Sequence, residues 1–199
     1  MPSRIPWPRP KPSTDIYRKR REKALNQCRA CLPPRRIGTC AYNGRRRPHP
    51  FHEGIMDLLQ SAMKTAIDEA RLSLREGNHG FGAVLLRGDQ IVAQAHDREE
   101  SDQDPTSHAE TNVIRMAAQH LGKHLDGCIL VSTHEPCPMC STAAVWSGIA
   151  EVAYGYSIAR AIRQGHTRID LTCAEVFARA GVALTLHPDV LADECELLY

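Results

Sequence analysis

Apolar residues recur along the chain in short segments whose spacing alternates between that of a helix and that of a strand. The longest segment, residues 55–76, repeats apolar positions every three or four residues and predicts one amphipathic helix. Two short apolar runs follow at 81–86 and 91–95, and the Gly-containing turn between them predicts a hairpin. Beyond the hairpin, the pattern predicts helices at 107–121, 137–147, 157–164, 172–180 and 188–197, and strands at 128–132, 151–154 and 182–186.

Strands that alternate with helices indicate the α/β class, in which one sheet carries helices on both faces. Ligands in such folds gather where strands end and helices begin. The two stretches of this chain with the strongest chemical character, around His108 and around Cys137, both lie at predicted strand-to-helix junctions. We therefore expect them to approach each other at one edge of the sheet.

Charge divides the chain into two unequal parts. Residues 1–53 hold 14 of the 25 Lys and Arg but only three of the 23 Asp and Glu, so the remainder is net acidic. This first part is also rich in proline and lacks apolar periodicity, which predicts a largely disordered N-terminal extension before a single domain at 54–199. The extension is open to several interpretations: a tail for nucleic acid or an acidic partner, a targeting segment, translation from a start codon upstream of Met56, or a plain solvated tail.

The chain has eight cysteines, and most of them stand singly in apolar stretches, as Cys128, Cys173 and Cys195 do. Such residues are typical of small buried thiols. With no signal peptide and no apolar run near 18 residues, we expect a cytoplasmic protein without a membrane contact. A second zinc site formed by extension residues is an open alternative, with Cys28, Cys31, Cys40 and His49 as its ligands.

Two short motifs, His108-Ala109-Glu110 and Pro136-Cys137-Pro138-Met139-Cys140, provide one imidazole, two thiols and a separate carboxylate. Cysteines three residues apart at the start of a helix share one face, so one metal ion reaches both sulfurs. Three protein ligands leave the fourth position of a catalytic zinc to water, whereas a structural zinc usually takes four. Glu110 projects beside the metal face, where it is placed to act as general base and acid. A redox pair, half of a zinc knuckle and a helix-capping histidine are the competing interpretations.

The order H-x-E followed by P-C-x-x-C resembles the signature of the cytidine deaminase-like zinc hydrolases, over residues 54–199. The runs 104–110 and 135–140 look most like those of guanine deaminases and bacterial tRNA adenosine deaminases. The resemblance implies a three-layer α/β/α sandwich with a five-stranded mixed sheet, and one Zn²⁺ per chain on His108, Cys137 and Cys140. It further implies hydrolytic deamination with Glu110 as the proton carrier. Relatives of this kind are commonly homodimers.

The resemblance also suggests residues that bind the substrate. Asp97 stands where relatives usually present an Asn to the base, and because a carboxylate only accepts hydrogen bonds, we expect N–H donors on the ring edge facing it. The alternative is that Asp97 caps its strand and points into solvent. The residues expected to bind the substrate are Asp97, Phe81, Ala109 and Trp146. Asn112 and Glu135 are expected to hold the site residues in place without binding the metal or the substrate themselves. Core packing for Trp146 and a surface position for Asn112 are the competing interpretations.

A small nucleobase or nucleoside is the expected substrate, of the guanine or cytosine type. A tRNA adenosine is the alternative, and it would need a basic surface that the net acidic domain lacks unless the extension provides it. A non-catalytic binding protein on the same fold is a third possibility. Past Gly155, His166 and Asp170 fall in the segment that closes over the substrate in relatives.

Overall fold

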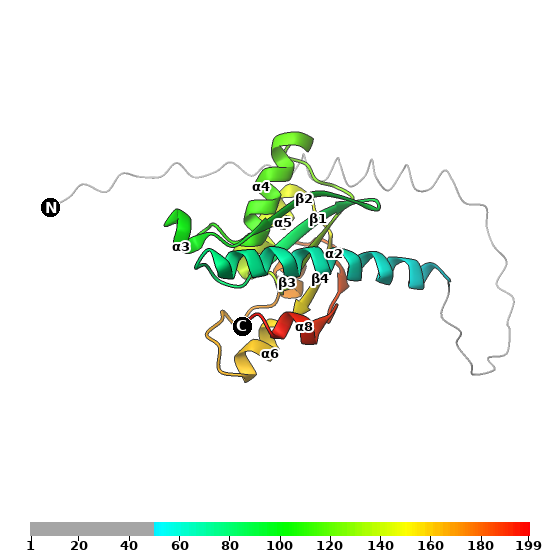
Figure 1. Cartoon of the computed structure of the whole chain (residues 1–199). Helices are drawn as coiled ribbons and strands as arrows, with labels where there is room; N and C mark the ends of the chain where they lie inside the picture. The colour runs from blue at the N-terminus through cyan, green and yellow to red at the C-terminus, as the bar shows by residue number, and fades with distance from the viewer. Residues whose placement is uncertain (1–49) are drawn as a thin grey trace, which may run out of the picture. The chain divides into compact units, whose positions relative to one another are not determined.

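The computed structural model describes the backbone of residues 50–199 and the side chains of residues 54–199. The predicted extension, and the second zinc site proposed within it, lie outside the described residues. Five strands form one sheet, and Figure 1 shows helices on both sides of it. The strands are β1 Gly82–Arg87, β2 Gln90–His96, β3 Cys128–His134, β4 Glu151–Tyr156 and β5 Thr185–His187. The helices are α2 Pro50–Arg75, α3 Glu99–Asp102, α4 Ala109–Leu121, α5 Pro138–Ser147, α6 Ile158–Arg163, α7 Cys173–Arg179 and α8 Ala192–Glu196.

The sheet is mixed and has the strand order β2-β1-β3-β4-β5. Strand β1 pairs antiparallel with both β2 and β3, whereas β4 pairs parallel with β3 and with β5. The five-stranded mixed sheet and the α/β class expected from the sequence are confirmed.

Alternate residues of the strands enter two separate cores. Val84 and Leu86 of β1 pack with α2 and α8 on one face, whereas Ala83 and Leu85 pack with α4, α5 and α7 on the other. Because both faces of the strands are buried, β3 is buried along its whole length. Helix α2 lies so close to β1 that a Cβ atom on Gly82 would stand 2.0 Å from the carbonyl oxygen of Ala66.

Two predicted elements near the C-terminal end differ from the structure. The strand expected at 182–186 forms only at Thr185–His187, because the N–H of Val182 bonds the carbonyl of Phe177 and so completes the end of α7. The helix expected at 188–197 begins only at Ala192, because Asp189 and Leu191 have φ angles of 61° and 52°. The short helix α3 was not predicted, since none of its residues is buried and it therefore has no apolar stripe.

Among the described residues, no helix combines the length and the apolar character needed to cross a membrane.

Candidate metal and catalytic site

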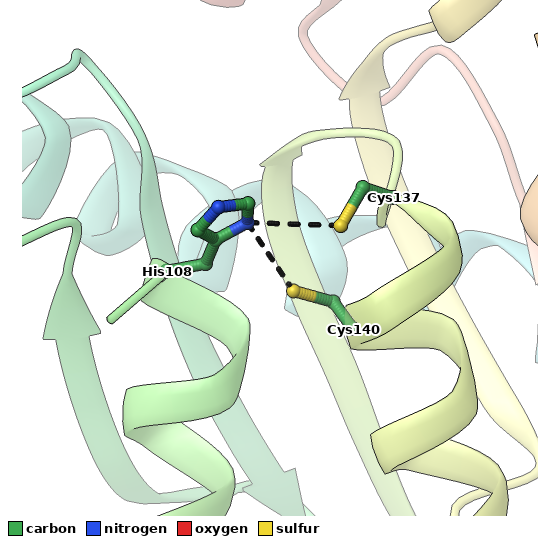
Figure 2. Close-up of side chains that lie close together, drawn as sticks. All are labelled: His108, Cys137 and Cys140. Carbon is green, nitrogen blue, oxygen red and sulfur yellow. Dashed lines mark hydrogen bonds between the residues drawn. The ribbon is translucent and has the colours of Figure 1, made fainter. Parts of the chain in front are cut away.

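The structure brings together the imidazole and the two thiols that the sequence singled out. His108 immediately precedes α4, Cys137 immediately precedes α5, and Cys140 lies in the first turn of α5. Figure 2 shows the three side chains pointing toward one another from these two helix starts. The Nδ1 atom of His108 lies 3.6 Å from the sulfur of Cys137 and 3.6 Å from the sulfur of Cys140.

These distances fit a tetrahedral zinc ion. Zinc bonds of about 2.0–2.1 Å to nitrogen and about 2.3 Å to sulfur, at a tetrahedral angle, separate the two ligand atoms by about 3.6 Å. Both nitrogen–sulfur pairs have this separation. The three ligand atoms lie within 4.8 Å of one another, so the donor set and its spacing suit one ion with a fourth position left open.

Hydrogen bonds among the three candidate ligands shift the pKa of each one. A hydrogen bond from the thiol of Cys140, together with one from His108, lowers the pKa of Cys137 to about 4. In turn, hydrogen bonding to the Cys137 thiolate raises the pKa of His108 to about 9. The pKa of Cys140 is raised by its hydrogen bond to Cys137 and by burial. A metal ion that enters therefore replaces protons on His108 and Cys140.

Glu110 provides a carboxylate beside these ligands. It lies in the first turn of α4 with 5% of its surface exposed, and the hydroxyl of Ser132 donates to its Oε1 at 3.0 Å. Burial raises the pKa of this carboxyl. A carboxylate whose proton affinity has been raised, in a cavity shared with His108 and Cys137, is suited to accept a proton and release it again.

The cavity in front of these groups has a volume of about 670 Å³. One wall is aromatic: the Phe81 ring centroid lies 5.1 Å from that of Tyr199 and 5.5 Å from that of His134. The hydroxyl of Tyr199 is within hydrogen-bond distance, 3.1 Å, of the hydroxyl of Thr133. The lining also includes Leu74, Asn78, His79, Glu99, Pro105, Glu135, Met139, His166 and Ile169.

Arg168 closes this wall from the segment between α6 and α7. Its Nε donates to Nε2 of His134 at 3.2 Å, and its guanidinium carbon lies 5.6 Å from the Phe81 ring centroid. The ring of His134 also donates from Nδ1 to the carbonyl of Glu135 at 2.8 Å. Burial lowers the pKa of His134 to about 4, so this ring is neutral at physiological pH. Sequence reasoning missed Tyr199, His134 and Arg168, because no local motif marks them.

Of the four residues expected to bind substrate, Phe81 lines the cavity, whereas Trp146, Ala109 and Asp97 do not. Trp146 lies nine residues after Cys137 along α5, about 13 Å further along the helix axis, with 72% of its surface exposed. Ala109, the first residue of α4, is fully buried in the core. Within the described residues, neither belongs to the cavity lining.

Asp97 is fully buried and does not point into solvent. Its Oδ1 accepts a hydrogen bond from the backbone N–H of Glu99 at 3.1 Å, and burial raises its pKa. Its Oδ2 has no hydrogen-bond partner among the described residues. Asp97 is not part of the cavity lining in the described structure, although it lies close to His108.

Asn112 and Glu135 both hold backbone near the site. The amide of Asn112 donates to the carbonyls of His96 at 3.1 Å and Ser107 at 3.0 Å, and so fixes the segment that leads into His108. The carboxylate of Glu135 accepts the N–H groups of Ile158 and Cys173, each at 3.0 Å. Glu135 therefore supports the segment that carries Arg168, and it also lines the cavity.

Comparison with known proteins agrees with this geometry. Residues 56–156 match the family model of the cytidine and deoxycytidylate deaminase zinc-binding region. The chain is 40% identical over 93 residues to a tRNA-specific adenosine deaminase of Aquifex aeolicus, and 38% identical over 97 residues to a guanine deaminase of Bacillus subtilis. These matches cover 46% and 48% of this chain and 62% of each relative, so the chain spans about three fifths of their length.

A solved structure gives a longer match. It comes from biochemical and structural studies of A-to-I editing by tRNA:A34 deaminases at the wobble position of transfer RNA. The two are 28% identical with a TM-score of 0.60, and the match covers 70% of this chain and 99% of that one.

Proposed function

Because the chain belongs to the family of the cytidine and deoxycytidylate deaminase zinc-binding region, we propose that it is a zinc-dependent deaminase of a nucleobase or nucleoside. One observation carries the proposal: three ligand atoms converge at the spacing of a zinc site, and the Glu110 carboxylate opens into the same cavity. In this proposal His108, Cys137 and Cys140 hold one zinc ion per chain.

When bound, zinc supplies Lewis acid chemistry that activates water for attack on the carbon bearing the exocyclic amine. Glu110 takes a proton from that water and delivers protons to the ring nitrogen and to the departing amine. Ammonia leaves, and the ring carbon becomes a carbonyl. The hydroxyl of Ser132 keeps one oxygen of Glu110 fixed, which directs the other toward the reaction. Proton transfer by a placed carboxylate contributes on the order of 10²–10⁴-fold.

The cavity favours a small planar substrate. Its wall of Phe81, His134 and Tyr199 suits a heteroaromatic ring, since offset and edge contacts between rings are favourable. Arg168 is the only Lys or Arg side chain that lines the cavity among the described residues. A polyanion draws on several such contacts with its phosphates, so a guanine-like or cytosine-like base or nucleoside is the first proposal.

Deamination of a tRNA adenosine is the second proposal, and the comparisons favour it specifically. A tRNA-specific adenosine deaminase is among the most similar relatives, and the structure from the tRNA:A34 study is covered almost completely. This function would need cationic surface from outside the cavity. The extension at 1–53 holds 14 Lys and Arg and is the part of the chain that we propose would supply it.

A substrate panel with matched variants tests the proposal. The full chain is loaded with zinc and assayed for ammonia release from guanine, cytosine, adenine and their nucleosides, and for inosine in tRNA. Glu110→Gln should retain zinc and lose at least about 100-fold in turnover. The control is Glu100→Gln, which changes an exposed glutamate of α3 and should match the wild type in both zinc content and turnover. If purified protein binds no zinc, or if Glu110→Gln turns over normally, the proposal fails.

A cytoplasmic homodimer stays a prediction from the sequence and from the resemblance. The same is true of the boundary between the extension at 1–53 and the deaminase domain at 54–199. Sedimentation of the full chain at several concentrations would test the dimer.

A further inference from the structure

The ring of His108 has a second nitrogen, which faces away from the two sulfurs. Because Nδ1 lies 3.6 Å from each sulfur, Nδ1 is the atom that faces the metal position. On the other side of the ring, Nε2 lies 3.8 Å from Oε2 of Glu99, in the short helix α3. If Nδ1 gives its lone pair to a metal ion, Nε2 must carry the proton, and an N–H in that position calls for an acceptor.

A second carboxylate lies in the same place. One oxygen or nitrogen atom from each of Asp97, Glu99 and His108 falls within a group whose members are all within 4.8 Å of one another. Asp97 is fully buried and held by the N–H of Glu99 through Oδ1, whereas its Oδ2 has no partner among the described residues. A buried acceptor without a hydrogen-bond partner is unfavourable, so this oxygen is suited to receive an N–H. Of the three side chains in the group, only His108 has an N–H to offer.

We infer that Asp97 and Glu99 are positioning residues that hold the Nε2 proton of His108 and thereby present its Nδ1 lone pair to the metal. This inference rests on the proposed function, because it takes the site to be a zinc site. A ligating imidazole almost always donates its other N–H to a carboxylate, a carbonyl or water, which fixes the tautomer and ring orientation and increases ligand basicity.

The distance between His108 and Glu99 indicates how their hydrogen bond would form. A separation of 3.8 Å is too long for a direct hydrogen bond. The Glu99 side chain is one-third exposed, so we expect it to rotate and bring its carboxylate within hydrogen-bond distance of Nε2. His79 also lies near Glu99, with its Nε2 3.8 Å from the same Oε2. Asp97 is the fixed member of the pair, and Glu99 is the adjustable one.

In this inference Asp97 orients His108, whereas from the sequence we expected it to bind the substrate. In Asp97→Asn, the amide oxygen keeps the bond from the N–H of Glu99, and the NH₂ group replaces Oδ2. A donor then replaces the acceptor that this inference assigns to the N–H of His108, which opposes the tautomer that zinc requires. Glu99→Gln removes the charge of the adjustable carboxylate. Glu100→Gln is the matched control, since Glu100 is exposed in the same short helix and is not part of the group.

Zinc affinity of the full chain, measured against a chromophoric chelator without substrate, tests this inference. We expect Asp97→Asn and Glu99→Gln to weaken zinc binding by about 10- to 100-fold, and Glu100→Gln to leave it unchanged. In zinc-loaded wild type, ¹⁵N-histidine NMR should show a protected Nε2 proton on His108 that Asp97→Asn loses. If Asp97→Asn does not fold, zinc affinity of Glu99→Gln decides the question.

Wild-type zinc affinity in both variants would overturn the inference. If those variants instead raised KM for the base, Asp97 and Glu99 would be assigned to substrate binding. The deaminase proposal has a separate test, because it fails when the wild type itself binds no zinc. Failure of the inference, in contrast, requires a wild type that binds zinc and variants that bind it equally well.

Discussion

Replacing Glu135 with Gln should destabilise the fold and loosen one wall of the cavity. Glu135 is 3% exposed, and each carboxylate oxygen accepts one backbone N–H, from Ile158 and from Cys173. These are the first residues of α6 and α7, where N–H groups have no partner within their own helix. One carboxylate therefore caps two helices and fixes both ends of the segment that carries Arg168.

The size of the effect follows from these two bonds. In Glu135→Gln, one oxygen becomes an NH₂ group, so one backbone N–H loses its acceptor and faces another donor. A hydrogen bond to a charged group contributes about 1.5–3 kcal/mol, and the surviving bond falls to the value of a neutral one, about 1 kcal/mol. We therefore expect a loss on the order of 3 kcal/mol in the free energy of unfolding. For a chain of this length, that corresponds to about 6–12 °C in Tm.

Urea unfolding monitored by circular dichroism measures this loss. The matched control is Glu175→Gln, because Glu175 also caps a helix but is exposed, in a capping box with Thr172. We expect the control to lose no more than about 1 kcal/mol. Zinc content of Glu135→Gln should stay at the wild-type level, whereas KM for the base should rise, since Arg168 lines the cavity. A loss below about 0.5 kcal/mol, or one equal to that of the control, would refute this reasoning.

Three further predictions concern the core, pH and metal uptake. Gly82→Ala should cost about 3 kcal/mol or more in urea unfolding, because its Cβ would lie 2.0 Å from the carbonyl oxygen of Ala66. Gly54→Ala, in an open position of α2, should instead stabilise by about 0.5–1 kcal/mol, and equal effects would contradict the packing described. The pKa of His134 is about 4 in the folded chain, below the ordinary 6.5. As the pH falls, the imidazole is therefore protonated in the unfolded chain before it is protonated in the folded chain, which favours unfolding. Stability should drop by up to about 3 kcal/mol between pH 6.5 and 4, and His134→Asn should show a shallower pH dependence; an unchanged slope would count against a neutral buried ring. Since the pKa of His108 is about 9 without metal, zinc binding at pH 7 should release at least one proton, measured by calorimetry in two buffers of different ionisation enthalpy. A binding enthalpy independent of the buffer would exclude that release.

Much of the fold could be predicted because the signals are local. The apolar repeat of 55–76 marks α2, and the two runs around a Gly turn mark the β1–β2 hairpin. The two motifs at His108 and Cys137 each lie at the start of a helix, so their meeting follows from the order of elements in the sheet. In these cases the residues that form the structure are neighbours along the chain.

The rest depends on contacts between distant parts of the chain. Tyr199 reaches Phe81, and Arg168 reaches His134, only after the sheet and the C-terminal helices have assembled. No spacing in the sequence marks such pairs. Trp146 was expected at the cavity because planar bases stack well on aromatic rings, but its place near the end of α5 carries it away from Cys137. Two residues of the same helix can therefore lie at different places, one at the site and one away from it.

The three buried acids of the described residues differ in the hydrogen bonds that their oxygens accept, and this difference separates their roles. Both oxygens of Glu135 are occupied by backbone N–H groups, which cannot give up their protons, so this carboxylate holds structure and cannot carry a proton. Asp97 has one oxygen on backbone and one without a partner among the described residues, and it lies near His108 but outside the cavity lining. Glu110 alone combines a single side-chain donor, Ser132, with a place in the cavity next to His108 and Cys137. Because a proton carrier needs a free oxygen that faces the reacting atoms, the pattern of bonds assigns this work to Glu110.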